Sequence, residues 1–129
     1  MRDYQRTISN PYHMPNNLYK QTLAMIRDYY RLKEEYDAML QESADPPDGQ
    51  PKGNKTGDPT GSLAIRLENT STRIKAIEKA KRGVPPEYIE GVWKSIQYRE
   101  KYPMDAGRNT YGRWKAKFIW LVAHYMEWI

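Results

Sequence analysis

Two narrow apolar stripes, separated by a segment rich in proline and glycine, constrain the fold of this 129-residue chain most strongly. Both stripes advance in alternating steps of four and three residues, which places their members on one side of a helix as in a coiled-coil seam. A seam this narrow is not stable alone in water, so each is expected to bury itself on the other. The first stripe comprises Leu18, Thr22, Met25, Tyr29, Leu32, Tyr36 and Met39, and the second comprises Leu63, Leu67, Thr70, Ile74 and Ile77.

The helix boundaries follow from local start and stop signals. Pro15-Asn16-Asn17 predicts a helix start after an N-terminal arm at 1–14, and the first helix should continue to about Glu42. Residues 43–59 hold four prolines and three glycines and are interpreted as a flexible linker. Asp58-Pro59 starts the second helix, which ends at Gly83. The prediction is an all-α chain whose residues 15–83 form a long antiparallel two-helix hairpin with Leu32 and Ile74 both buried.

A smaller helix pair is predicted over residues 84–129. Its first helix begins at Pro86-Glu87, ends by Tyr102-Pro103 and carries Gly91, which we interpret as allowing a close helix approach. The final helix is expected to be capped by Asn109 or Thr110 and to run to the C-terminus. The apolar face of the first helix comprises Ile89, Val92, Trp93 and Ile96, and that of the second comprises Tyr111, Trp114, Phe118, Leu121, Val122 and Tyr125.

Positive charge is concentrated where this final helix begins. The chain has a net charge of +5, and residues 99–117 hold six basic and two acidic side chains. Cations near a helix N-terminus oppose the helix dipole, and a polyanionic partner would relieve that opposition. An amphipathic helix, a turn and a terminal helix with a basic start is the layout of a helix-turn-helix that binds double-stranded DNA. The predicted base-edge or phosphate contacts are Thr110, Arg113 and Lys117, supported by Arg108, Asn109 and Lys115, with Arg99 and Lys101 on backbone phosphates.

The segment VPPEYIEGVWKSIQYREKYPMDAGRNTYGRWKAKFIWLVA resembles the C-terminal module of phage and prophage late-gene transcription regulators of the RinA/ArpU type. That module is in turn similar to region four of sigma factors, and the helix TYGRWKAKFIWLVA is the most similar part. The resemblance implies a DNA-binding transcriptional regulator of prophage origin, with RNA polymerase as a further partner. The family pattern usually places a seven-residue helix before the turn, whereas residues 102–107 offer hardly more than one helical turn.

The alternative function is a helical interaction or assembly protein without a nucleic-acid role. In that case the hairpin seams, or a stripe formed by Trp120, His124 and Trp128, would bind another chain, including a second copy of this one. No catalytic motif is present, and His13 and His124 are 111 residues apart, so neither an enzyme nor a metal or cofactor site is predicted. The chain has no cysteine and no apolar run long enough to span a membrane, which fits a cytoplasmic protein.

Overall fold

Five helices make up the part of the chain that the computed structural model describes, residues 5, 10–44 and 59–129. No strand occurs among these residues, so the all-α prediction is confirmed. Most of the predicted linker and most of the N-terminal arm lie outside the described residues. The helices are α1 (Asn16–Arg27), α2 (Tyr29–Ala44), α3 (Pro59–Arg82), α4 (Pro86–Tyr98) and α5 (Arg108–Tyr125).

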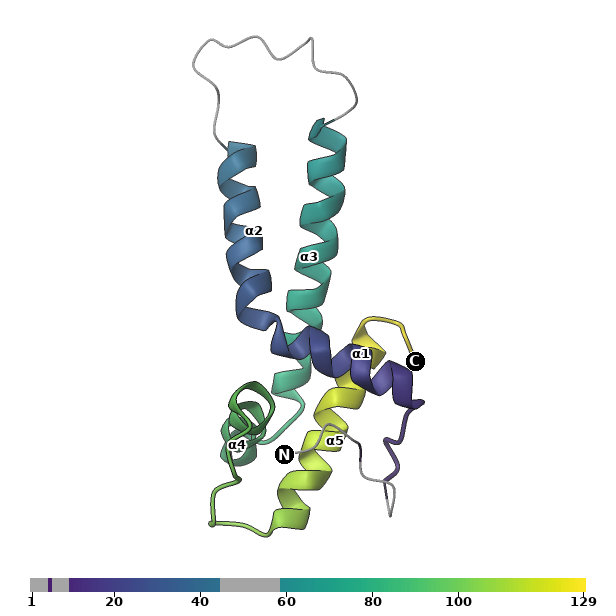
Figure 1. Cartoon of the computed structure of the whole chain (residues 1–129), viewed down its shortest axis with the longest axis vertical. Coiled ribbons are helices and arrows are strands. Elements are labelled where there is room, and N and C mark those ends of the chain that lie inside the picture. Colours follow the sequence, from purple (N-terminus) through teal and green to yellow (C-terminus); the bar gives the residue numbers. More distant parts are fainter. Residues whose placement is uncertain (1–4, 6–9, 45–58) are drawn as a thin grey trace.

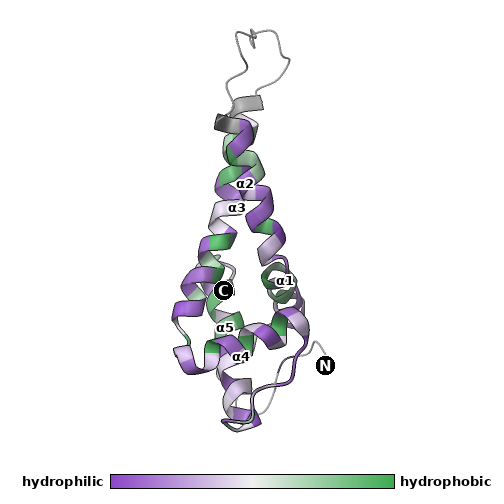
Figure 2. Ribbon diagram, turned by 90° about the vertical axis from the view of Figure 1, so that its left-hand side faces the viewer, coloured by the Kyte–Doolittle hydropathy of each residue, from purple (hydrophilic) through white to green (hydrophobic). Residues whose placement is uncertain are grey.

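Helices α2 and α3 pack side by side in opposite directions and project from a base formed by the other helices (Figure 1). Leu32 of α2 is 3% exposed and Ile74 of α3 is 6% exposed, so both residues are buried as the sequence predicted. Hydrophobic and hydrophilic bands alternate along both helices, as expected where each buries only one seam (Figure 2). Where the hairpin joins the base, the Tyr29 hydroxyl donates a hydrogen bond to Glu78 over 2.6 Å.

The first predicted helix is broken at Asp28, so the expectation of one continuous helix from Pro15 to Glu42 is wrong. The chain turns there, and α1 leaves the hairpin to pack against α4 and α5 (Figure 1). Two reciprocal hydrogen bonds join the C-terminal ends of α1 and α4. Arg27 Nε donates to the Ile96 carbonyl over 2.9 Å, and Gln97 Nε2 donates to the Ile26 carbonyl over 2.6 Å. Each helix thus satisfies a carbonyl near the end of the other, which stabilises the bend.

Helix α5 lies at the centre of the base and contacts α1, α3 and α4. This explains why its second half is apolar on more than one side. The face opposite the predicted one contributes Ile119 and Ala123 to the core. The fully buried residues of α5 are Tyr111, Phe118, Ile119, Val122 and Ala123.

The ends of α5 differ from the sequence-based expectation. Gly107 occupies the N-cap position and no side chain caps the helix, so neither Asn109 nor Thr110 has the predicted capping role. The helix ends at Tyr125, short of the C-terminus. Glu127 adopts a left-handed backbone with a φ of 62°, and the Trp128 N–H donates to the Ala123 carbonyl over 2.9 Å. This is the geometry of a Schellman motif, and it carries Trp128 off the helical stripe that the sequence predicted.

The interpretation of Gly91 is confirmed. A Cβ atom at this position would lie 2.7 Å from Cε1 of Tyr111 in α5 and 2.9 Å from Cδ of Pro103 in the loop that follows α4. Real Cβ atoms do not approach neighbours this closely. The absence of a side chain therefore lets α4, α5 and their connecting loop meet at one point.

We expect Gly91→Ala to lower the free energy of unfolding by about 1–2 kcal/mol, because overpacking against the fixed Tyr111 ring outweighs the better helix propensity of alanine. Gly83→Ala is the matched control. There a Cβ would meet only Cδ1 of half-buried Leu121 and one backbone oxygen, and a terminal methyl group can rotate away. Its effect should stay below about 1 kcal/mol. Urea unfolding of both variants measures the difference, and equal losses would contradict the close-approach argument.

Candidate nucleic-acid interface

The connection between α4 and α5 is held by contacts to one buried side chain, Tyr111. The ring of Tyr102 stacks on the Tyr111 ring, with centroids 5.1 Å apart and planes at 10°. The Tyr111 hydroxyl donates a hydrogen bond to Asp105 over 2.7 Å, and Pro103 packs against α4 at Gly91. A loop attached at three successive points fixes where α5 starts and how it is rotated. Residues 99–107 form this clamped loop, and they contain no helix.

The predicted contacts divide between two sides of α5. Asn109, Arg113 and Lys117 follow one another at intervals of four residues and therefore share one side. Asn109 and Arg113 are exposed. Lys117 is half-buried, because its ammonium lies 5.3 Å from the centroid of the Trp114 ring. We call Asn109, Arg113 and Lys117 the basic face of α5.

Aromatic side chains support this basic face from behind. Tyr111 and Phe118 are fully buried, as predicted. Trp114 was expected to be buried with them but is only half-buried, and its ring stacks on Tyr88 of α4 at 6.0 Å. The packing therefore fixes the rotation of α5 while leaving one side of it open to solvent.

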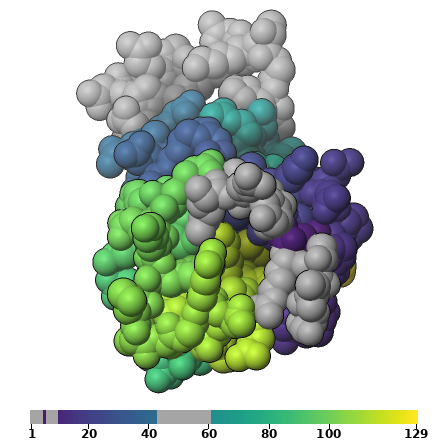
Figure 3. All heavy atoms as spheres, turned by 60° about the horizontal axis from the view of Figure 1, so that its bottom comes forward, coloured from purple at the N-terminus to yellow at the C-terminus, as the bar shows by residue number. Residues whose placement is uncertain are grey.

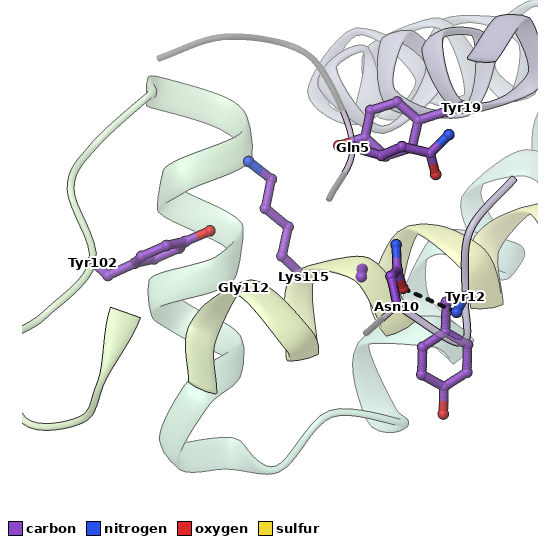
Figure 4. Close-up of a pocket in the computed structure, with 8 residues that line it drawn as sticks. Gln5, Asn10, Tyr12, Tyr19, Tyr102, Gly112 and Lys115 are labelled. Atoms are coloured by element: carbon purple, nitrogen blue, oxygen red, sulfur yellow. Dashed lines mark hydrogen bonds between the residues drawn. The ribbon is translucent and has the colours of Figure 1, made fainter. Parts of the chain in front are cut away.

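Lys115 lies on the other side of α5, since two residues correspond to about 200° of rotation. It is half-buried and lines a pocket of about 120 Å³ beside the described part of the N-terminal arm (Figure 4). In Figure 4 its side chain extends between Tyr102 and the neighbouring Gln5 and Tyr19. Lys115 therefore does not lie on the basic face. The pocket is lined by Gln5, Asn10, Tyr12, Tyr19, Tyr102, Gly112, Lys115 and Ala116.

The other predicted contacts lie around the start of α5. Arg99 and Lys101 are exposed in the clamped loop, Arg108 is exposed in the first turn of α5, and Thr110 is half-buried there. Arg99 ends α4 in a left-handed conformation with a φ of 56°. Figure 3 looks onto this end of the molecule and shows the loop and the first turns of α5 at its surface.

The electrostatics of this end favour an anion. The first turn of α5 contains no acidic residue and no side-chain cap, so the helix dipole adds to the positive charge of the cations. Within the described part of the chain, neither Arg113 nor Lys117 forms an ion pair. The ion pairs found there join Arg31 to Asp28 and Glu35, Lys33 to Glu78, and Lys94 to Glu90.

The stripe proposed for the alternative function is partly covered by the chain itself. The ring of Trp120 stacks on His124 with centroids 4.9 Å apart, and the ring of Tyr12 in the arm lies against Trp120 with centroids 5.6 Å apart. With Trp128 displaced from the helix, Trp120, His124 and Trp128 do not form a continuous exposed stripe. No group of three potential metal ligands occurs among the described residues, and none of the described helices has the length and apolar character needed to span a bilayer.

Sequence reasoning missed the residues that position the basic face. Tyr88 and Tyr102 stack on side chains of α5, and Asp105 accepts the Tyr111 hydrogen bond. These contacts join three segments of the chain, so no helical periodicity could have revealed them. The only available signal was the abundance of tyrosine, eleven residues against one phenylalanine, which indicates rings that need a partner for their hydroxyl groups.

Comparisons with known protein families, with curated proteins and with solved structures found no match. The resemblance to prophage late-gene regulators therefore stays a prediction. The function has to be argued from the geometry of the described residues.

The hydrogen bond from Tyr111 to Asp105 makes the stability of the loop depend on pH. Its acceptor is a carboxylate, which favours the protonated phenol and raises the pKa of Tyr111 from 10.0 to about 12. Because the folded-state pKa is the higher one, this contribution to stability is complete below the ordinary pKa and is lost as the pH rises through the folded-state value.

We therefore expect Tyr111→Phe to lower the free energy of unfolding at neutral pH and to speed amide exchange in residues 102–107. The stability difference between wild type and variant should shrink as the pH rises from about 10 to about 12. Urea unfolding across this range and hydrogen exchange at neutral pH measure the two effects, with exchange in the α2–α3 hairpin as the internal control. A difference that does not change with pH would show that the hydrogen bond does not hold the loop.

Proposed function

We propose that the protein is a DNA-binding transcriptional regulator that binds duplex DNA through the first half of α5. The observation that carries the proposal is the basic face, where Arg113 is exposed, Lys117 flanks it, and no carboxylate of the described residues pairs with either. A solvated face of a stable helix usually intersperses both signs of charge. Here buried aromatics fix the helix, and only neutral and positive side chains occupy the first two exposed turns.

The geometry suits insertion into the major groove, which is about 12 Å wide and admits an α-helix. In this arrangement Asn109, Arg113 and Lys117 face base edges or phosphates along the groove. Arg99, Lys101 and Arg108 lie on the clamped loop and the first turn, where they reach the phosphates that border the groove. Lys115 on the opposite side adds to the positive potential without touching the groove.

The cellular role rests on the resemblance. A late-gene regulator of prophage origin would act in the cytoplasm of the host cell, with RNA polymerase as its second partner. The clamped loop has no separate second helix, so we propose that α4 is the supporting helix and α5 the recognition helix.

One observation favours the alternative function of an assembly protein. Ile65 of α3 is 61% exposed and Leu40 of α2 is 42% exposed, near the far end of the hairpin. Large apolar side chains in such positions can bind another chain. The two functions use different surfaces, because the far end of the hairpin, which would bind another chain, is remote from the basic face, which would bind DNA.

Binding of a random-sequence duplex at several salt concentrations tests the proposal. Each phosphate contact releases counterions, and four to six contacts predict a loss of affinity of roughly a hundredfold or more between about 50 and 200 mM salt. Arg113→Ala should weaken binding and reduce the log–log salt slope by about 0.9, with an unchanged melting temperature because an exposed cation adds little stability. Arg66→Ala is the matched control, since Arg66 is an exposed arginine on the hairpin, and it should leave the slope unchanged.

The opposite pattern would support the assembly function. In that case duplex DNA would bind no better than heparin, and Arg113→Ala would have no effect. A concentration-dependent oligomer, measured by sedimentation, would be lost on Ile65→Asp and retained on Arg113→Ala. That combination would overturn the DNA-binding proposal.

A further inference from the structure

A second group of exposed cations lies along α3. Lys75, Lys79 and Arg82 follow one another at intervals of four and three residues, and all three are exposed. None of them forms an ion pair with a carboxylate of the described residues. We call these three residues the basic row of α3.

The helix dipole explains only part of this row. Cations in the last turn of a helix stabilise it, which accounts for Lys79 and Arg82. Lys75 lies a full turn earlier, and like charges at intervals of three and four repel one another on a helix surface. Repulsion within the row offsets part of this stabilisation, and a polyanion bound along the row would relieve that repulsion.

Two contacts fix the position of this row relative to α5. The Lys79 ammonium lies 4.4 Å from the centroid of the Tyr125 ring, and a Cβ at Gly83 would lie 2.6 Å from Cδ1 of Leu121. The order of these pairs shows that the end of α3 and the end of α5 run antiparallel, as Figure 1 also shows. The end of α3 is thus level with Leu121, two turns beyond Arg113.

The same two contacts show that the basic row and the basic face lie on one side of the molecule. Lys79 and Lys75 precede Gly83 by four and eight residues, and Lys117 and Arg113 precede Leu121 by the same intervals. Each interval of four rotates the side chain by about 40° in the same sense on both helices. In a pair of antiparallel helices, side chains turned by the same angle away from the contact point lie on the same side of the pair. The cations that precede Gly83 in α3 and those that precede Leu121 in α5 are therefore on one side.

We infer that the basic row of α3 is a second contact surface for the same DNA duplex, one that binds backbone phosphates beyond the groove occupied by α5. This rests on the proposed function and extends its site. Lys75 lies eight residues before Gly83 on α3, and Arg113 lies eight residues before Leu121 on α5. Because Gly83 and Leu121 are at the same level, these two stretches together cover about 24 Å along the molecule. One strand of B-DNA presents about seven phosphates over that length, enough for every cation of the row and the face to find a partner.

The chain offers a matched pair of variants for the test. Lys75→Gln with Arg82→Gln removes two cations that lie seven residues apart on α3, and spares the Lys79 contact with Tyr125. Arg66→Gln with Arg73→Gln also removes two exposed cations seven residues apart on α3. Each control position precedes its counterpart by nine residues, about two and a half turns, and therefore lies on the opposite side of the helix.

Salt titration of the full-length variants on a random-sequence duplex gives the readout, with melting curves to confirm folding. Lys75→Gln with Arg82→Gln should reduce the log–log slope by about 1.8, which corresponds to two lost phosphate contacts, and the control pair should keep the wild-type slope. The footprint on the duplex should also shorten at one end only for the first pair.

The outcomes separate this inference from the proposed function. If Arg113→Ala weakens binding while both double variants keep the wild-type slope and footprint, the inference is overturned and the proposed function stands. Equal loss in both double variants would also overturn it, because the effect would then reflect net charge and not position. If the wild-type protein shows no salt-dependent duplex binding, the proposed function fails and the inference fails with it.

Discussion

The burial of α5 against three other helices is the interaction on which the rest of the structure depends. Its position is fixed at both ends by specific contacts. At the start, the Tyr111 ring is held by Tyr102, by Tyr88 at 5.4 Å and by the hydrogen bond to Asp105. At the end, the Schellman motif closes the helix after Tyr125. A helix fixed in this way presents the same side to solvent without help from a ligand, which is what recognition of a rigid duplex requires.

The base also determines how the hairpin is attached. The bend at Asp28 directs α1 onto α5, and the reciprocal hydrogen bonds of Arg27 and Gln97 tie the ends of α1 and α4 together. The end of α3 packs on α5 at Gly83 and Lys79. Because α3 belongs to both the hairpin and the base, the basic row of α3 is held in register with the basic face of α5. A longer polyanion could therefore contact both without rearrangement of the chain.

The sequence correctly predicted features that depend on local periodicity, and it did not predict features that depend on tertiary contacts. Steps of four and three correctly predicted that Leu32 and Ile74 are buried, and a lone glycine in a helix correctly indicated the close approach at Gly91. The sequence did not predict the bend at Asp28, because the steps of four and three residues continue unbroken through it. The part of the stripe in α1 packs on α4 and α5, and the part in α2 packs on α3. The side of α5 on which Lys115 lies relative to the pocket could not be predicted, because only the packing of Tyr102 and the arm reveals it. Periodicity does place Arg113 and Lys117 away from the apolar face of α5, and Arg113 is exposed there.

The central claim is that duplex DNA contacts the exposed side of α5, and amide chemical-shift mapping tests it most directly. The isotope-labelled protein is titrated with a random-sequence duplex, and each amide signal is followed. The account predicts shifts concentrated in residues 99–117, with a second group at residues 75–82 and none in residues 62–70 of the hairpin. Shifts confined to the hairpin, or an unchanged spectrum at saturating duplex, would contradict it.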